Sequence, residues 1–291
     1  MDLARATLSR WLRLITAAAV LAITGLLITA GQAASAHAGT APRQPGPKPT
    51  IVLEHGAWAD ASSWAGVIHQ LQRDGYTVDA PPDPLRGLSY DSSYLADYLS
   101  TITGPVVLVG HSYGGAVITN AATGNPNVRA LVYVDAFIPA QGQTLLQLVA
   151  AKPGSCLAGN PANVFNAVPY PGAPAGDVDL YLKTAPDSTY PGFARCFANG
   201  LPASQAAVLA ATQRPLAFSA ASDPSGVPAW KTIPSWSVIG TADHVLPPAE
   251  QLFMSRRAHA HITEINAGHL SLISDPCAVA RVIVQAARST S

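Results

Sequence analysis

The chain has 291 residues, of which 12% are charged, and its formal net charge at pH 7 is zero. It has no basic stripe, no acidic run and no heptad pattern, which argues against a nucleic-acid partner. About 250 residues follow an N-terminal targeting segment, enough for one domain with a sizeable core.

The first segment has the features of a secretory signal peptide. Arginines precede an apolar stretch over residues 14–30, and the small residues at 34–38 offer Ala-x-Ala cleavage patterns. The apolar stretch is shorter than the roughly 20 residues of a spanning helix, which favours cleavage over a retained membrane anchor. We therefore expect residues 1–38 to be a signal peptide and residues 39–49 an extended lead-in. The mature protein is expected to be secreted, without a stable membrane anchor.

Short β-rich runs alternate with helical stretches from Thr50 onward. Strands are expected at 51–53, 76–79, 106–109, 128–134, 236–239 and 262–265, and helices at 60–73, 91–102, from the glycine-rich turn to about 122, 247–258 and 275–288. This alternation predicts an α/β fold with a mostly parallel, doubly wound sheet of about six strands and helices on both faces.

One stretch joins a predicted strand to a predicted helix through a tight turn. The four apolar β-formers at 106–109 run into Gly-His-Ser-Tyr-Gly-Gly, and a helix-compatible segment follows at once. So tight a reversal forces its apex residue, Ser112, toward a strained left-handed backbone. It also needs residues without side chains, here Gly110 and Gly114, so that strand and helix can approach closely. The pattern predicts a Gly-x-Ser-x-Gly nucleophile elbow that exposes the Ser112 hydroxyl above the sheet.

The alternation of strands and helices stops at about Pro139 and returns after about Ile233. The intervening segment is rich in proline, glycine, alanine and aromatic residues, and its helical signal is modest. A long insertion between sheet elements usually covers a site rather than extending the sheet. We therefore expect residues 139–233 to form a cap on an α/β domain that spans residues 50–291. Its low charge and its aromatic residues favour an apolar or aromatic small substrate.

The side chains that acyl transfer requires follow predicted strands. A serine hydroxyl needs a base to accept its proton, and His269 lies just after the last predicted strand. The base in turn needs a carboxylate, for which Asp243 and Asp135 both qualify, because each follows a strand. Small residues precede Asp243 and would let its carboxylate reach an imidazole, so Asp243 is preferred. Asp135 is the alternative acid and could instead anchor the first turn of the cap.

An oxyanion hole is expected from two backbone amides. Gly-x-Ser-x-Gly enzymes take one donor from the residue after the nucleophile, here Tyr113, and the other from the loop after the first strand. That loop reads Glu54-His55-Gly56-Ala57-Trp58, and the amide of Ala57 is the candidate. His55 and Gly56 are expected to shape the turn.

Four motifs in this order carry a resemblance to a known family. They are HGAW after the first strand, GHSYGG, GTADHVLPP and AGHLSLIS. Together they resemble an α/β-hydrolase-fold serine hydrolase, most closely the small esterase and hydroxynitrile-lyase-like branch that includes plant methylesterases. The resemblance implies a catalytic triad in the chain order Ser112, Asp243 and His269. It also places Asp135 at the acid position that some other branches use.

The chain departs from that family pattern in two places. Only a short proline-rich lead precedes Thr50, so the first antiparallel strands of the family are not expected there. Leu270 stands where hydroxynitrile lyases of this branch carry a lysine. The leading interpretation is therefore a secreted serine carboxylesterase that acts on small-molecule esters. The alternatives are a cyanohydrin-cleaving lyase and a non-catalytic ligand-binding protein of the same fold.

The chain contains three cysteines, which permit one disulfide in an exported protein. Cys156 and Cys196 both lie in the predicted cap, whereas Cys277 lies at the start of the closing helix, so the first two are the preferred pair. Three free thiols are the alternative. No phosphate loop, dinucleotide fingerprint or metal-ligand set is evident, and neither a cofactor nor a metal is expected.

Overall fold

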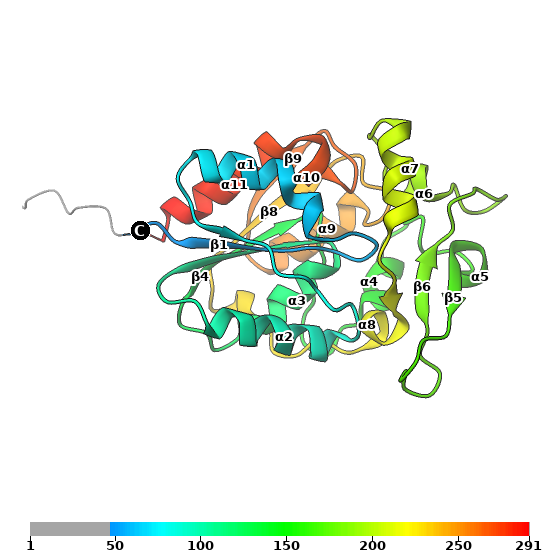
Figure 1. Cartoon of the computed structure of the whole chain (residues 1–291), viewed down its shortest axis with the longest axis horizontal. Helices are drawn as coiled ribbons and strands as arrows, with labels where there is room; N and C mark the ends of the chain where they lie inside the picture. Colours follow the sequence, from blue (N-terminus) through cyan, green and yellow to red (C-terminus); the bar gives the residue numbers. More distant parts are fainter. Residues whose placement is uncertain (1–46, 291) are drawn as a thin grey trace, which may run out of the picture. The chain divides into compact units, whose positions relative to one another are not determined.

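The computed structural model describes residues 47–290, and the predicted signal peptide lies outside the described residues. Within this range six strands form a sheet in the order β2-β1-β3-β4-β8-β9, and every pairing is parallel (Figure 1). The strands are β1 (Thr50–Glu54), β2 (Val78–Asp79), β3 (Val106–His111), β4 (Val128–Val134), β8 (Ser235–Gly240) and β9 (His261–Ile265). The predicted α/β sheet of about six strands is confirmed.

The centre of the sheet is formed by the most continuous apolar runs. All six residues of β3 are buried, and β1 and β4 flank it. On one face of the sheet α1 (Ala65–Arg73) packs against α11 (Pro276–Arg288), and on the other α2 (Leu88–Ser100) packs against α3 (Tyr113–Ala121) (Figure 1). Strands covered on both faces need apolar residues at successive positions, which explains the unbroken runs in the sequence.

Two predicted elements differ in extent from those observed. The second strand contains only two residues and lies at the edge of the sheet, next to β1. The following helix begins at Leu88, three residues before the predicted start at Asp91. The Asp91 carboxylate lies inside the first turn and accepts the amide protons of Arg86 and Gly87. A side chain inside the helix thus accepts hydrogen bonds from the two backbone amides that precede the helix.

The remaining helix signals agree closely with the structure. Asp60 accepts the amide proton of Ser62 at 2.7 Å and caps a 3₁₀ turn, Ala61–Trp64, that leads into α1. Asp275 caps α11 in the same way, through the amide of Ala278. No helix among residues 47–290 is long and apolar enough to cross a membrane.

The segment between β4 and β8 contains a second, antiparallel sheet that the sequence did not predict. Its strands, in the order β5-β6-β7, are β5 (Phe165–Val168), β6 (Asp179–Leu182) and β7 (Leu216–Ala217). The helices of this segment are α4 (Leu145–Ala151), α5 (Pro161–Val164), α6 (Phe193–Cys196), α7 (Ala203–Thr212) and α8 (Phe218–Ser222). Strands of two to four residues carry too little periodicity to be recognised, and their pairing brings together residues far apart in the chain.

Cys156 and Cys196 form a disulfide within this segment, with their Cα atoms 5.7 Å apart. This is the pair preferred from the sequence. The backbone amide of Cys156 also donates to the carbonyl of His244, at 2.8 Å. The disulfide therefore holds α6 against the chain next to the loop that follows β8.

Removing this disulfide should destabilise the protein. The bond closes a loop with a sequence separation of 40 residues, for which the chain-entropy model gives about 4 kcal/mol. We expect the double variant Cys156→Ser/Cys196→Ser to lose about 2–4 kcal/mol in the free energy of unfolding, measured with urea. Cys277→Ser, which removes an exposed free thiol, is the matched control and should leave stability unchanged. Non-reducing peptide mapping that found Cys277 in a bridge would contradict this pairing.

Candidate active site

Ser112 lies at the junction between β3 and α3, with no residue between strand and helix other than itself. Its backbone has φ 51° and ψ −120°, in the positive-φ region that a non-glycine residue rarely adopts. Its carbonyl accepts the amides of Gly115 and Phe137, at 3.0 and 3.1 Å. These bonds hold the serine in the strained geometry expected of a nucleophile elbow.

The glycines of the elbow occupy positions where any side chain would collide with backbone. A Cβ at Gly110 would lie 2.5 Å from the carbonyl oxygen of Gly114, and one at Gly114 would lie 2.6 Å from that of His55. A Cβ at Gly56 would lie 2.7 Å from the Cβ of Ser112. The strand, the helix and the loop after β1 therefore meet at the serine with no space for side chains between them.

Ser112, His269 and Asp243 form one hydrogen-bonded chain. The Nε2 atom of His269 lies 2.9 Å from the Ser112 hydroxyl, and its Nδ1 atom lies 2.8 Å from an Asp243 carboxylate oxygen. The three residues are between 0 and 3% exposed. His269 follows β9, Asp243 follows β8 and Ser112 follows β3, so the carboxyl ends of three strands of the parallel sheet bring these side chains together.

Asp243 receives four hydrogen bonds, which suits an ionised carboxylate. The backbone amides of Val245 and Leu246 donate to Oδ1, at 2.8 and 3.0 Å, and the side-chain amide of Gln251 donates to Oδ2, as does His269. Burial raises the pKa of Asp243, and the hydrogen bonds from Leu246, Val245 and Gln251 act in the opposite direction. Gln251 was not singled out from the sequence, because its position on α9 (Pro248–Arg257) carries no motif.

Burial lowers the pKa of His269 to about 3, so its imidazole is neutral at pH 7. With Nδ1 donating to Asp243, the lone pair of Nε2 faces the Ser112 hydroxyl. His111, the residue just before the serine, supports this arrangement. Its ring Nε2 lies 2.9 Å from the backbone carbonyl of His269, and burial lowers its pKa as well. The sequence contained this histidine but gave no sign of its contact.

Asp135 lies close to this chain but is bonded elsewhere. Its carboxylate accepts the backbone amide of Gly240 at 2.7 Å, and it also accepts the amide and the hydroxyl of Ser271. It is fully buried at a backbone φ of 47°. Asp135 therefore connects the loop that carries Asp243 to the helix that follows His269. It does not anchor the first turn of the cap, which the sequence had suggested.

The amides of Ala57 and Tyr113 are both available beside the serine. Within the described part of the chain neither N–H has a hydrogen-bond acceptor, and both residues line the same pocket as Ser112. Tyr113 is the first residue of α3, where backbone N–H groups have no partner inside the helix. His55 shapes the loop that precedes Ala57, because its Nδ1 lies 2.9 Å from the Gly56 carbonyl and its Nε2 accepts the amide of Asp83.

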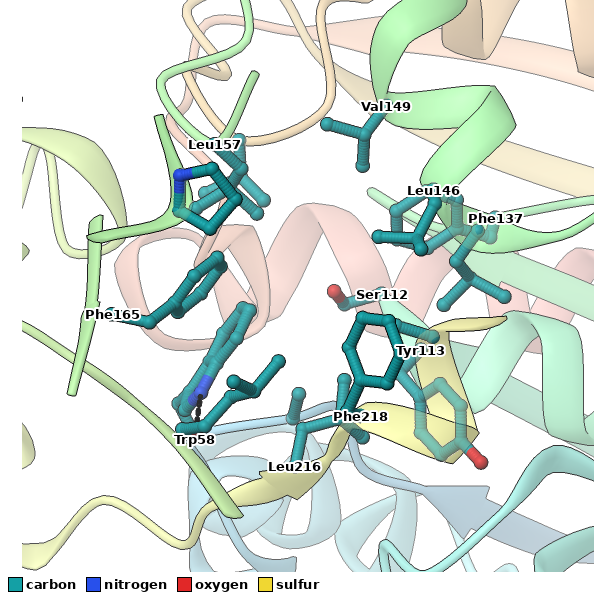
Figure 2. Close-up of a pocket in the computed structure, with 16 residues that line it drawn as sticks. Trp58, Ser112, Tyr113, Phe137, Leu146, Val149, Leu157, Phe165, Leu216 and Phe218 are labelled. Atoms are coloured by element: carbon teal, nitrogen blue, oxygen red, sulfur yellow. Dashed lines mark hydrogen bonds between the residues drawn. The ribbon is translucent and has the colours of Figure 1, made fainter. Parts of the chain in front are cut away.

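The Ser112 hydroxyl faces a pocket of about 120 Å³ with apolar walls (Figure 2). The pocket is lined by Ala57, Trp58, Tyr113, Phe137, Leu145, Leu146, Val149, Leu157, Pro161, Phe165, Leu180, Leu216, Phe218, Ala221 and Val245. The Tyr113 hydroxyl points away from the pocket (Figure 2), and the Trp58 indole N–H donates to the Leu180 carbonyl. The serine is therefore the one polar side-chain group that these lining residues direct at a bound molecule.

Comparison with known proteins agrees with this fold. The family model described as the alpha/beta hydrolase family matches residues 51–282. The chain belongs to the alpha/beta hydrolase family.

Among the residues described, no group of three or more His, Cys, Asp or Glu side chains could hold a metal ion.

Individual relatives of this hydrolase are esterases and related enzymes. The chain is 36% identical to the Nocardioides sp. carbendazim hydrolyzing esterase. The match covers 34% of this chain and 46% of the esterase. The chain is 30% identical to a putative chloroplastic methylesterase of Arabidopsis thaliana over 36% of its length and 27% of that protein. The chain thus matches less than half the length of these relatives. The methylesterase match agrees with the branch predicted from the sequence.

Solved structures share the fold over most of the chain. A pyrethroid hydrolase from Sphingobium faniae superposes with a TM-score of 0.65, at 23% identity, over 83% of this chain and 98% of that one. At this level of identity the likeness establishes the fold.

Proposed function

We propose that this alpha/beta hydrolase is a serine carboxylesterase that acts on small apolar or aromatic esters. The observation that carries the proposal is the buried Ser112 hydroxyl, which is hydrogen-bonded to His269 and faces an apolar pocket. Apolar cavities of about 150 Å³ accept a benzene molecule. This pocket therefore has room for one compact apolar group beside the reacting carbonyl.

The proposed reaction uses the three bonded residues in sequence. The Ser112 oxygen attacks the ester carbonyl carbon as its proton passes to Nε2 of His269, and Asp243 stabilises the imidazolium that forms. The Ala57 and Tyr113 amides donate to the carbonyl oxygen as it gains negative charge. When the carbon–oxygen bond to the alcohol breaks, His269 gives its proton to the departing oxygen. His269 then takes a proton from water as the water oxygen attacks the acyl carbon. The bond from that carbon to the Ser112 oxygen breaks, His269 returns its proton to the serine oxygen, and the acid is released.

The esterase proposal is tested by a panel of p-nitrophenyl esters with acyl groups of increasing length, including the benzoate. Given the pocket volume, we expect kcat/KM to be highest for short or aromatic acyl groups and to fall for long chains. Leu157 lines the pocket, so Leu157→Ala enlarges the pocket and should shift the preference toward longer acyl groups. A wild-type enzyme that hydrolyses none of these esters would contradict the proposal.

The two alternative functions receive less support. Cyanide release calls for a cation in the pocket, and the residues that line it include no lysine or arginine, with Leu270 buried next to His269. A lyase would cleave mandelonitrile without hydrolysing esters. A purely ligand-binding protein would not react with a fluorophosphonate probe, whereas an activated Ser112 should displace its fluoride.

The pH dependence of hydrolysis should reflect His269. The base must be neutral, and burial lowers its pKa below the ordinary 6.5. The neutral form therefore persists as the pH falls, and activity is lost only when the pH passes through the lowered pKa. We expect the acid limb of kcat/KM to have its midpoint below 6.5. Circular dichroism over the same range is the control for acid unfolding, since His55 and His111 also have lowered pKa values. A midpoint above 6.5 would contradict the prediction.

We also propose that the protein is exported, with residues 1–38 removed. The support is the basic, apolar and small-residue order of that segment. N-terminal sequencing of protein from the culture medium should find a start just after Ala36 or Ala38. Retention of the full chain in the cell would argue against export.

A further inference from the structure

Three buried acidic side chains take no part in the proposed reaction, although one ends the strand that leads to Ala57 and another contacts the side chain of Tyr113. Glu54, Asp83 and Asp91 are each 2% exposed or less. The carboxyl groups of Glu54 and Asp83 are within hydrogen-bonding contact. The Tyr113 hydroxyl donates to Asp91 at 2.6 Å. Among residues 47–290 none of the three acids has an ion-pair partner.

The hydrogen bonds to these acids are unequally distributed. Asp91 accepts the Tyr113 hydroxyl and two backbone amides, as an ionised carboxylate should. Asp83 accepts only the Leu85 amide, at Oδ1, and its Oδ2 has no partner. Glu54 accepts no donor, and its Oε2 is also without a partner. Two buried carboxylates in contact repel each other and lack solvation, whereas one proton between them satisfies both oxygens.

Glu54 is directly connected to the loop that supplies the first oxyanion amide. It is the last residue of β1, and its carbonyl lies so close to α3 that a Cβ at Gly114 would be 2.7 Å from it. His55 follows, and its ring bonds both to the Asp83 amide and to the Gly56 carbonyl. Ala57 follows Gly56 directly. Contacts of Glu54 and Asp83 therefore hold the loop that carries the Ala57 amide.

We propose that Glu54 is a positioning residue whose carboxyl group stays protonated in the folded protein and donates its O–H to Asp83. This bond holds the end of β1 where Ala57 presents its amide to the oxyanion. Asp91 accepts the Tyr113 hydroxyl and so holds the side chain of the second donor residue. The positioning role rests on the esterase function proposed above, whereas the protonated state does not.

The charged surroundings of Glu54 agree with a retained proton. Burial, followed by the charge of Asp83 and a hydrogen bond with it, raises the pKa of Glu54 well above its ordinary value. Burial and the charge of Asp91 also raise the pKa of Asp83, to about 8, whereas its hydrogen bonds with Glu54 and the Leu85 amide lower it. The pair therefore keeps a proton at pH 7, and the Leu85 amide bonded to Asp83 favours Glu54 as the group that carries it. The titratable or charged groups around the pair are Asp91, Tyr113, His55 and Arg214. Arg214 acts on Asp83 through charge alone and makes no ion pair with it.

The protonated state can be tested without any assay of activity. If Glu54 is protonated when folded and ionised when unfolded, unfolding releases a proton, so stability falls as the pH rises. Glu54→Gln keeps a donor and cannot titrate. We expect the ratio of the wild-type to the Glu54→Gln unfolding constant to rise about tenfold per pH unit above the ordinary glutamate pKa. Glu264→Gln, at an exposed position of β9, is the matched control for the substitution itself.

The positioning role is tested by kinetics on the ester panel. Glu54→Gln should keep kcat within about threefold of wild type, because its amide can still donate to Asp83. Glu54→Leu has no donor, and a displaced Ala57 amide should lower kcat by at least about tenfold, with little change in KM, since a whole oxyanion donor is worth roughly 100- to 1,000-fold.

Each outcome bears on the proposal. A pH-independent ratio for Glu54→Gln shows that Glu54 is ionised when folded and overturns it. Failure of Glu54→Gln to fold while Glu264→Gln folds also overturns it, because a neutral donor then cannot replace the carboxyl group. Full kcat in Glu54→Leu overturns the positioning role. If wild type hydrolyses no ester, the proposed function fails, and the unfolding titration still decides the protonated state.

Discussion

Ser112→Ala will abolish ester hydrolysis and leave the fold intact. The variant removes the attacking oxygen, and losses of this kind cost roughly 10⁴- to 10⁶-fold in rate. The side chain contributes one buried hydroxyl, whose only hydrogen-bond partner among the described side chains is His269. The backbone bonds that hold the elbow come from the Ser112 amide and carbonyl and are unaffected.

The measurement is kcat for the best ester of the panel, with circular dichroism and thermal unfolding to verify the fold. Ser93→Ala, on the exposed face of α2, is a matched control in which a hydroxyl bonded only to the Ser89 carbonyl is lost. It should retain wild-type activity. Retention of even a tenth of wild-type turnover in Ser112→Ala would show that Ser112 is not the nucleophile.

Asp243→Asn should lower kcat by roughly 10⁴-fold, as substitutions that enforce the wrong imidazole tautomer do. Two backbone amides donate to Oδ1, so the amide oxygen of the new asparagine will take that position. Its NH₂ group then faces Nδ1 of His269, which becomes the acceptor. The proton moves to Nε2, and the lone pair that should accept the Ser112 proton is lost.

Asp135→Asn is the paired variant that separates the two candidate acids. Asparagine can still accept the Gly240 amide and can bond to Ser271, so its effect should fall on stability, with kcat changed less than about tenfold. Both variants are compared at temperatures matched for the folded fraction. The opposite ranking in kcat would make Asp135 the acid and Asp243 a structural residue.

Much of the fold could be predicted because its signals are local. The buried run of β3, the glycines around Ser112 and the return of strands after the cap each appear within a few consecutive residues. The start of α2 was misplaced, because Asp91 was interpreted as a residue at the helix start and instead reaches back from the first turn. The antiparallel sheet between β4 and β8 has no clear signal in the sequence, because its strands are short and are stabilised by pairing across long sequence separations.

The sequence by itself determined the parallel α/β architecture, the serine at a strand–helix junction, and the order of the candidate acid and base after later strands. Those features depend on backbone propensity and on apolar periodicity, which neighbouring residues encode. Only the tertiary structure decided which carboxylate bonds to His269, because that contact joins residues 26 positions apart and the contact with Ser112 joins residues 157 apart. The same holds for the apolar pocket and for the contact between Glu54 and Asp83. Each of these requires loops from separate strands to converge at one edge of the sheet, and no local pattern specifies which side chains then meet.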